Sequence, residues 1–222
     1  MKYVIYFILA SIEFCGCTKT TTFVADAANS QLPEYSESGK NIAGAIFNDT
    51  TWRSDVYSSG LSGTYLTGCW IFSSLSGDST TIILNGKHSD HSINFVETLP
   101  SVPLSFFFVI KGLKIENQDS LLKLNGKTFD VGDNHNYVTL AYADDHFNFL
   151  KKGASIGNIV FNKAGRVAGI TIGDGSPGNP VIYPFIVSGH FDFMISGTNS
   201  YHVKDGRFDM VAQWKTNLVI TQ

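Results

Sequence analysis

From residue 41 onward, hydrophobic residues occur in short runs separated by polar and turn residues. The runs are rich in β-branched and aromatic residues, and none keeps the period of an amphipathic helix. This pattern predicts β-strands in AGAIFN, GCWIFSSL, TTIILN, SINFVETL, LSFFFVI, NYVTLAYA, GNIVFN, RVAGITI, VIYPFIV, HFDFMIS and RFDMVAQW. In HFDFMIS, the residues Phe191, Phe193 and Ile195 point to one face of the strand, and Asp192 points to the other.

Turn residues between these runs favour antiparallel hairpins. Asn85-Gly86, Asn125-Gly126 and Asp205-Gly206 are dipeptides that accept the positive φ angles of tight hairpin turns, and a further hairpin is expected around residues 162–165. The chain has many short strands, with turn residues roughly every 8 to 12 residues. This pattern is typical of an all-β, antiparallel two-sheet β-sandwich. An open lipocalin-like barrel is the alternative fold.

The first residues of the chain have a different pattern. Lys2 precedes an apolar run from Tyr3 to Ala10, and this layout is that of a secretory signal. The run is shorter than the roughly 20 apolar residues of a membrane-spanning helix. We therefore expect a signal peptide over residues 1–16. The mostly small and polar residues 17–40 are expected to form a flexible tether, and residues 41–222 a single β-sandwich domain.

The stretch FCGC, from Phe14 to Cys17, lies at the end of this apolar segment. Cleavage after Gly16 would make Cys17 the first residue of the mature chain, and its thiol could then carry a lipid. The stretch resembles the lipobox of bacterial lipoproteins. The resemblance implies that Cys17 is lipidated and that this lipid attaches the protein to a membrane. Ordinary secretion and a short membrane anchor are the alternatives.

Cysteine content indicates whether disulfides are expected, and net charge indicates which classes of partner are not. Apart from Cys15 and Cys17, the chain has only Cys69, so no internal disulfide is expected in the mature protein. Cys69 lies in an apolar run, where a free thiol behaves as a small buried hydrophobe. The net charge is −3, and no basic cluster exceeds the pair Lys151-Lys152. Nucleic acid is therefore not an expected partner.

Two stretches at the ends of the folded region carry a further resemblance. The front stretch, GKNIAGAIFNDTTW, contains Gly39, Asn41, Asn48 and Trp52, and the back stretches are GHFDF (residues 189–193) and DGRFD (residues 205–209). They resemble the opening and closing strands of a group of Bacteroidetes envelope lipoproteins with no established activity. The resemblance implies a β-rich lipoprotein of the outer membrane.

Within the closing stretches, each residue also has an expected role. Asp205-Gly206 is expected to be a turn, and Phe208 is expected to lie in the core. Arg207 and Asp209 are expected to form an exposed charged pair. None of these roles is catalytic.

Residues suited to metal binding or catalysis are sparse. His88, Asp90 and His91 place two imidazoles and a carboxylate within four residues, but a zinc site needs three or four converging ligands. They are weak metal candidates, and a polar hairpin tip is the favoured interpretation, so no cofactor is expected. Ser155 fits the pattern G-x-S-x-G, which acts on a strand-to-helix turn. A β-rich context is expected around it, and we therefore do not expect an enzyme.

Tryptophans and one loop are the remaining candidates for ligand binding. Trp52 and Trp214 flank polar residues and would stack on a sugar ring if exposed, whereas Trp70 is expected in the core. The Gly- and Pro-rich loop 174–180 is a candidate binding loop, with a structural crossover as its alternative.

Together these features predict a non-catalytic envelope lipoprotein that binds a ligand or an envelope protein partner through loops. A carbohydrate-binding accessory protein that recognises a glycan is the alternative, and a metal-dependent hydrolase comes third. The expected location is the outer membrane. Because no acidic run follows Cys17, the periplasmic face is favoured over the cell surface.

Overall fold

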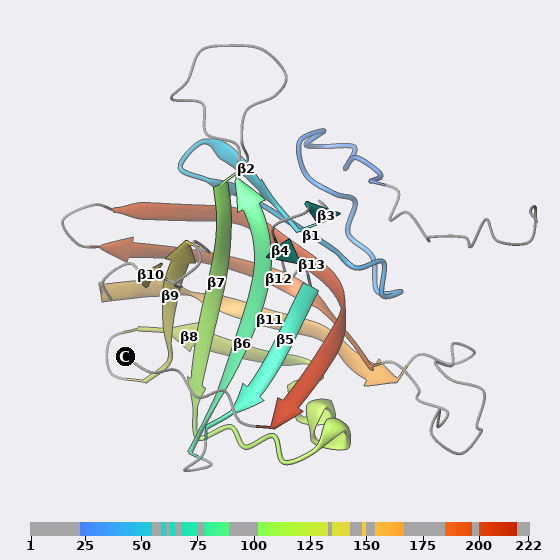
Figure 1. Cartoon of the computed structure of the whole chain (residues 1–222), viewed down its shortest axis with the longest axis vertical. Coiled ribbons are helices and arrows are strands. Elements are labelled where there is room, and N and C mark those ends of the chain that lie inside the picture. The colour runs from blue at the N-terminus through green and yellow to red at the C-terminus, as the bar shows by residue number, and fades with distance from the viewer. Residues whose placement is uncertain are drawn as a thin grey trace, which may run out of the picture.

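The computed structural model of the chain describes residues 23–54, 59–60, 63–64, 68–74, 78–88, 102–132, 135–142, 148–149, 154–166, 185–196 and 200–216 (Figure 1). Strands dominate this part of the chain: β1 (Ile42–Phe47), β2 (Thr50–Arg53), β3 (Ser59–Gly60), β4 (Gly63–Thr64), β5 (Gly68–Ser73), β6 (Ser79–His88), β7 (Val102–Lys111), β8 (Lys127–Val131), β9 (Tyr137–Tyr142), β10 (Asn148–Phe149), β11 (Ala154–Arg166), β12 (Phe185–Ser196) and β13 (Tyr201–Thr216).

Strand pairing closes part of the sheet on itself. β1 pairs with β2 and β13, β13 pairs in parallel with β5, and β6 pairs with both β5 and β2. These strands form a closed ring. The sheet then continues from β6 through β7, β9 and β10, and from β13 through β12, β11 and β8. In Figure 1, β5 to β7 cross in front of β11 to β13, so the two extensions form crossed layers.

The all-β prediction is confirmed, but both layers belong to one sheet of eleven strands, while β3 and β4 pair only with each other. β13 carries the sheet from one layer to the other, because its first part pairs with β12 and β1 while Ala212 to Thr216 pair with β5. At the opposite corner, Lys87 and His88 at the end of β6 pair with β2. These two corners join the layers into one sheet.

Aromatic side chains fill the space between the layers. Phe106 and Phe108 of β7 meet Phe193 of β12 edge to face, each with ring centroids 5.5 Å apart. Phe191 of β12 contacts both β7 rings in the same manner, with centroids 5.7 Å away. This geometry suits the quadrupoles of aromatic rings. The alternation predicted for HFDFMIS is confirmed, since Phe191, Phe193 and Ile195 are buried and Asp192 is exposed.

β7 is buried on both faces, which explains the uninterrupted apolar run FFFVI at residues 106–110. Phe106 and Phe108 face the main core. Phe107 faces a smaller cluster on the other side of the sheet, together with Phe72, Ile83 and Ala141. Trp70, expected in the core, is partly buried against this smaller cluster.

Two of the predicted hairpin turns lie inside strands. Asn85-Gly86 lies within β6, where Gly86 fits under the indole ring of Trp52. Asp205-Gly206 lies within β13, at a shift in the pairing with β12 and β1. Asp205 has φ of 52° at this point, so the dipeptide forms a bulge. The positive φ predicted for this dipeptide is present at Asp205, but the chain does not reverse.

Other turn predictions had mixed outcomes. Asn125-Gly126 is a turn, with φ of 66° at Gly126, but it follows a short 3-10 helix, η1 (Gln118–Leu124), that the sequence pattern did not predict. The hairpin expected around residues 162–165 is absent, because β11 continues through these residues with a register shift. A tight turn occurs at Asn48-Asp49 between β1 and β2, where both residues have positive φ.

Cys69 is a free, buried cysteine, as predicted. Burial raises the pKa of its thiol to about 12, so the side chain is a protonated hydrophobe at neutral pH.

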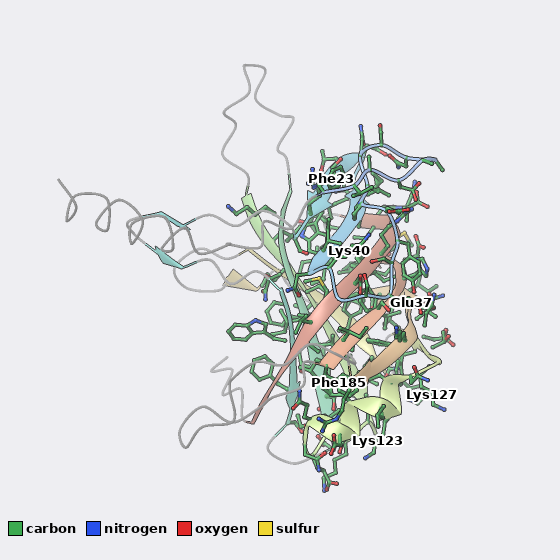
Figure 2. The ribbon with its side chains drawn as sticks, turned by 90° about the vertical axis from the view of Figure 1, so that its right-hand side faces the viewer. Phe23, Glu37, Lys40, Lys123, Lys127 and Phe185 are labelled. Carbon is green, nitrogen blue, oxygen red and sulfur yellow. The ribbon has the colours of Figure 1, made fainter. Side chains whose placement is uncertain are left out.

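The expected tether is wrong for residues 23–40. These residues, here called the strap, lie along the outer face of β1, β13 and β12, the face that points away from the main core. Figure 2 labels Phe23, Glu37 and Lys40 along the strap. Leu32 of the strap is fully buried. The folded body therefore begins at residue 23 within the described chain, and not at residue 41.

The close approach of Trp52 to Gly86 gives a stability prediction. A Cβ at Gly86 would lie 2.4 Å from the Trp52 ring and 2.7 Å from the carbonyl oxygen of Arg53. Gly86→Ala should therefore lower the free energy of unfolding by about 1–3 kcal/mol, measured by urea denaturation. Gly165→Ala is the matched control, because a Cβ there meets no atom within 4 Å. Equal stability of the two variants would contradict the described packing.

Candidate functional site

The outer face under the strap carries several buried or partly buried charged and titratable groups. β13 supplies Arg207 and Asp209, and β12 supplies His190. Because residues two apart on a strand share a face, Arg207 and Asp209 both point toward the strap, while Phe208 between them points into the core.

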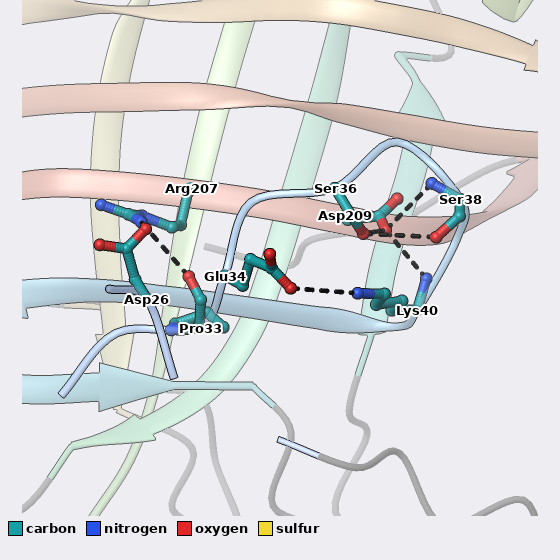
Figure 3. A network of polar contacts seen from close by, with 8 residues as sticks. All are labelled: Asp26, Pro33, Glu34, Ser36, Ser38, Lys40, Arg207 and Asp209. Atoms are coloured by element: carbon teal, nitrogen blue, oxygen red, sulfur yellow. Dashed lines mark hydrogen bonds and ion pairs between the residues drawn. The ribbon is translucent and has the colours of Figure 1, made fainter. Parts of the chain in front are cut away.

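The carboxylate of Asp209 binds one end of the strap. It accepts hydrogen bonds from the backbone N–H groups of Ser38 (3.2 Å), Gly39 (2.7 Å) and Lys40 (3.1 Å), and from the hydroxyl of Ser36. Figure 3 shows this carboxylate enclosed by the strap. Asp209 is only 2% exposed. A buried carboxylate is stable only where such donors replace water, so the strap backbone completes this site.

Glycines let the strap approach the sheet closely. A Cβ on Gly39 would lie 2.5 Å from Cγ2 of Ile186, and the backbone of Gly39 has φ of 75°. A Cβ on Gly44 of β1 would lie 2.4 Å from Cδ of Pro33 in the strap. Both positions therefore require glycine. Gly39 is required for its positive φ and for the close contact, and Gly44 is required for the close contact alone.

Arg207 holds the other end of the strap. Its Nη1 lies 2.6 Å from a carboxylate oxygen of Asp26 and 3.3 Å from the carbonyl oxygen of Pro33. The Asp26 carboxylate also accepts hydrogen bonds from the backbone N–H groups of Ala28 and Asn29. These backbone hydrogen bonds, followed by Arg207, lower the pKa of Asp26. The pair is well shielded, with side chains 17% and 21% exposed.

Between these two contacts, Tyr35 of the strap packs against His190 with ring centroids 4.4 Å apart and ring planes tilted by 30°. The Tyr35 hydroxyl donates to a Glu37 carboxylate oxygen at 2.9 Å, and Lys163 donates to the Glu37 carbonyl oxygen at 2.7 Å. Burial raises the pKa of Tyr35, and the Glu37 contact adds to the shift. Burial, and then the charge of Arg207, lower the pKa of His190. The imidazole is therefore neutral at pH 7.

This arrangement is suited to holding a polypeptide. The charged groups of Asp26, Arg207 and Asp209 are occupied by contacts between the strap and the sheet. Beside the strap, the same region of β1 and β13 has an open hollow of about 300 Å³, lined by Ile46, Asn48, Asp49, His202 and Lys204. The hollow combines an apolar side chain with both signs of charge.

The expected exposed pair of Arg207 and Asp209 is therefore wrong. Each side chain binds the strap, which lies about 170 residues away in sequence. The composition of the strap partly indicates an anion-binding turn, because Ser36, Ser38 and Gly39 are residues that turn the backbone and expose its N–H groups. Nothing in the single sequence indicated which carboxylate those groups bind.

Trp52 does not line a ligand site. Its side chain is fully buried, its indole Nε1 donates to the Leu104 carbonyl oxygen at 2.8 Å, and its ring lies 4.3 Å from that of Phe106. The prediction that Trp52 stacks on a sugar is wrong, because the polar residues around it lie on the opposite face of a short strand. Trp214 contributes backbone pairing to β13 opposite Ile71, and its side chain is outside the described residues.

The other predicted residues lie mainly outside the described part of the chain. Cys17, Asp90 and His91 are among these. His88 is described only by its backbone, which pairs with Trp52. The loop 174–180 is also outside the described residues.

Ser155 lies in β11, and the chain continues as a strand on both sides of it. This is not the strand-to-helix turn that its sequence pattern requires. Among the described residues, no group of three or more histidine, cysteine, aspartate or glutamate side chains is placed to hold a metal ion. The described residues also include no helix long and apolar enough to cross a membrane.

Comparisons with known protein families, curated proteins and solved structures find no match to this chain. The resemblance to Bacteroidetes envelope lipoproteins stays a prediction.

Strap docking makes the stability sensitive to Asp209. Asp209→Asn places an amide against backbone N–H donors, and the loss of charged hydrogen bonds should lower the free energy of unfolding by about 2–3 kcal/mol. Urea denaturation measures this loss, and limited proteolysis should show faster cleavage within the strap. Asp205→Asn, at an exposed carboxylate on the same strand, should change stability by about 0.5 kcal/mol or less. Equal effects of the two substitutions would contradict the described role of Asp209.

The lowered pKa of His190 predicts a pH dependence. Between its folded pKa and the unfolded value of about 6.5, the unfolded chain binds more protons at this site, so stability is lost as the pH falls. Urea denaturation at a series of pH values should show a smaller loss below about pH 6.5 for His190→Gln than for the unaltered protein. Neighbouring Arg207, Asp192 and Glu37 remain in both proteins. Identical pH profiles would contradict the burial of His190 beneath Tyr35.

Proposed function

We propose that this protein is a non-catalytic envelope lipoprotein, attached to the outer membrane through a lipid on Cys17, which binds a partner close to the membrane surface. The observation that carries this proposal is the docking of the strap. The five residues 18–22 separate Cys17 from Phe23, where the described chain begins. An extended chain of this length spans about 20 Å, so a lipid on Cys17 would keep the body near the bilayer.

A connection of only five residues between Cys17 and the strap implies a different role from that of a lipoprotein with a long tether. A tether over residues 17–40 would let the body sample partners far from the membrane. With the strap docked, the binding surface has a restricted range of positions and partners must come to the membrane. Restriction of this kind raises the effective concentration of the body for membrane-associated partners.

The charged groups under the strap are used within the chain itself. Arg207, Asp209 and Asp26 hold the strap to the sheet, and the neutral His190 packs against Tyr35. These side chains act as structural contacts between two parts of one chain. Carbohydrate binding is not favoured by a specific observation, since Trp52 is buried.

Cell fractionation tests the attachment directly. Cys17→Ala should move the protein from the membrane fraction to the soluble fraction, because the lipid-bearing thiol is lost. Cys15→Ala is the matched control and should stay with the membrane, because Cys15 would be removed with residues 1–16. Retention of Cys17→Ala in the membrane fraction would contradict the proposal.

Protease treatment of intact cells then distinguishes the two faces of the outer membrane. We propose the periplasmic face, for which the body should be protected in intact cells and digested after lysis. Digestion of intact cells would place it on the cell surface.

A further inference from the structure

The strap covers only part of the outer face of the sheet. Strand pairing aligns Ile156 of β11 with Met194 of β12, Met194 with His202 of β13, and Lys204 of β13 with Ile46 of β1. Directly paired residues share a face, and this is the face on which Arg207 and Asp209 meet the strap. We call this region, formed by Ile46, Ile156, Asp192, Met194, His202 and Lys204, the open half.

The open half has apolar side chains in contact with solvent. Ile156 is 65% exposed, the largest value among the exposed large hydrophobic residues of the described chain. Met194 and Ile46 are partly exposed, and Ile46 lies in the hollow of about 300 Å³. A single exposed isoleucine is ordinary on a protein surface. Here it shares a face with two other apolar side chains and a hollow that can take a further side chain.

Among the described residues, the charge of this surface is mainly negative. Asp192 of β12 and Asp130 of β8 share the outer face, because each pairs with Asn158 of β11. Asp49 lines the hollow and Asp205 lies in the bulge of β13. Lys204 is the cation of this group. A second copy of the chain would therefore bring like charges together across a symmetric contact, and a basic partner fits better.

Asp192 in the open half has a position similar to that of Asp209 under the strap. Both carboxylates project from the outer face. Asp209 accepts three backbone N–H groups of an extended segment. Asp192 accepts a hydrogen bond from the N–H of Asp205 at 3.1 Å and keeps further lone pairs for other donors. The Asp192 side chain is exposed to solvent, so a donor or cation of a partner can reach the carboxylate.

We propose that the open half is a docking surface for an extended, basic and apolar segment of a partner protein, bound beside the strap and in the same manner. The segment's backbone N–H groups meet Asp192, an apolar side chain enters the hollow at Ile46 or packs on Ile156 and Met194, and basic side chains face Asp49 and Asp130. This inference rests on the proposed binding function and names the surface and the class of partner.

A short synthetic peptide in which lysine and valine alternate is the probe. Its binding to the purified protein is measured by fluorescence anisotropy, with a peptide of alternating glutamate and valine as the charge control. The basic peptide should bind, and the acidic peptide should not. The double variant Ile156→Ser with Asp192→Asn should weaken binding by about tenfold or more, and added salt should weaken it further.

The chain offers a matched control on η1. Leu122 is 54% exposed, and Asp119 has an exposed side chain that pairs with Arg166 at the other end of β11 from Ile156. Leu122→Ser with Asp119→Asn should leave peptide binding unchanged. Circular dichroism and urea denaturation of both double variants test whether each is folded.

Several results would overturn the inference. These are failure of the basic peptide to bind, equal binding of the acidic peptide, or equal losses in the two double variants. Sedimentation gives a further test. If the unaltered protein and the control variant are dimers and the Ile156→Ser, Asp192→Asn variant is a monomer, the inference is overturned, because the occupant would then be a second copy of the chain. None of these results bears on the fractionation of Cys17→Ala, so the proposed attachment stands or falls separately.

Discussion

The buried carboxylate of Asp209 is the interaction on which the arrangement of the outer face depends. A carboxylate covered by other parts of the chain must be given hydrogen-bond donors in place of water. The strap supplies three backbone N–H groups and the hydroxyl of Ser36. It can do so only where the chain turns tightly at Gly39 and lies close to Ile186. The position of the strap along β13 follows from this contact.

β13 connects this contact to the rest of the molecule. Phe208 and Met210 alternate with Arg207 and Asp209, so one strand packs into the core with one face and binds the strap with the other. The same strand pairs with β12, β1 and β5 and closes the ring of strands. Its outer face is covered around Arg207 and Asp209, and open around His202 and Lys204. The boundary between covered and open surface is set by how far the strap extends.

The faces of individual strands were predictable from the sequence, whereas several turns and the long-range features were not. Alternation in HFDFMIS correctly predicted the inward and outward faces of β12, and the largely apolar run LSFFFVI correctly predicted a strand. The dipeptides Asn85-Gly86 and Asp205-Gly206 were misassigned, because a glycine serves close packing under Trp52 or a bulge as well as a hairpin turn. Closure of the ring depends on β13 bending between layers, which no local pattern encodes.

The candidate site was predicted least well. Residues 17–40 were predicted to form a tether because they are mostly small and polar, yet Leu32, Pro33 and Tyr35 of the strap pack against the sheet. Arg207 and Asp209 were predicted to form an exposed pair, and no local pattern in the sequence indicates a partner for either side chain. Their partners lie at the other end of the chain, so only the folded arrangement reveals them.

Hydrogen exchange at the backbone amides of Gly39 and Lys40 tests the docked strap most directly. Both amides donate to the buried Asp209 carboxylate, so they should exchange far more slowly than amides of an unstructured peptide, and at rates similar to those in β13. Exchange of Gly39 and Lys40 at the rate of an unstructured chain would contradict the account, because the strap would then be a free tether.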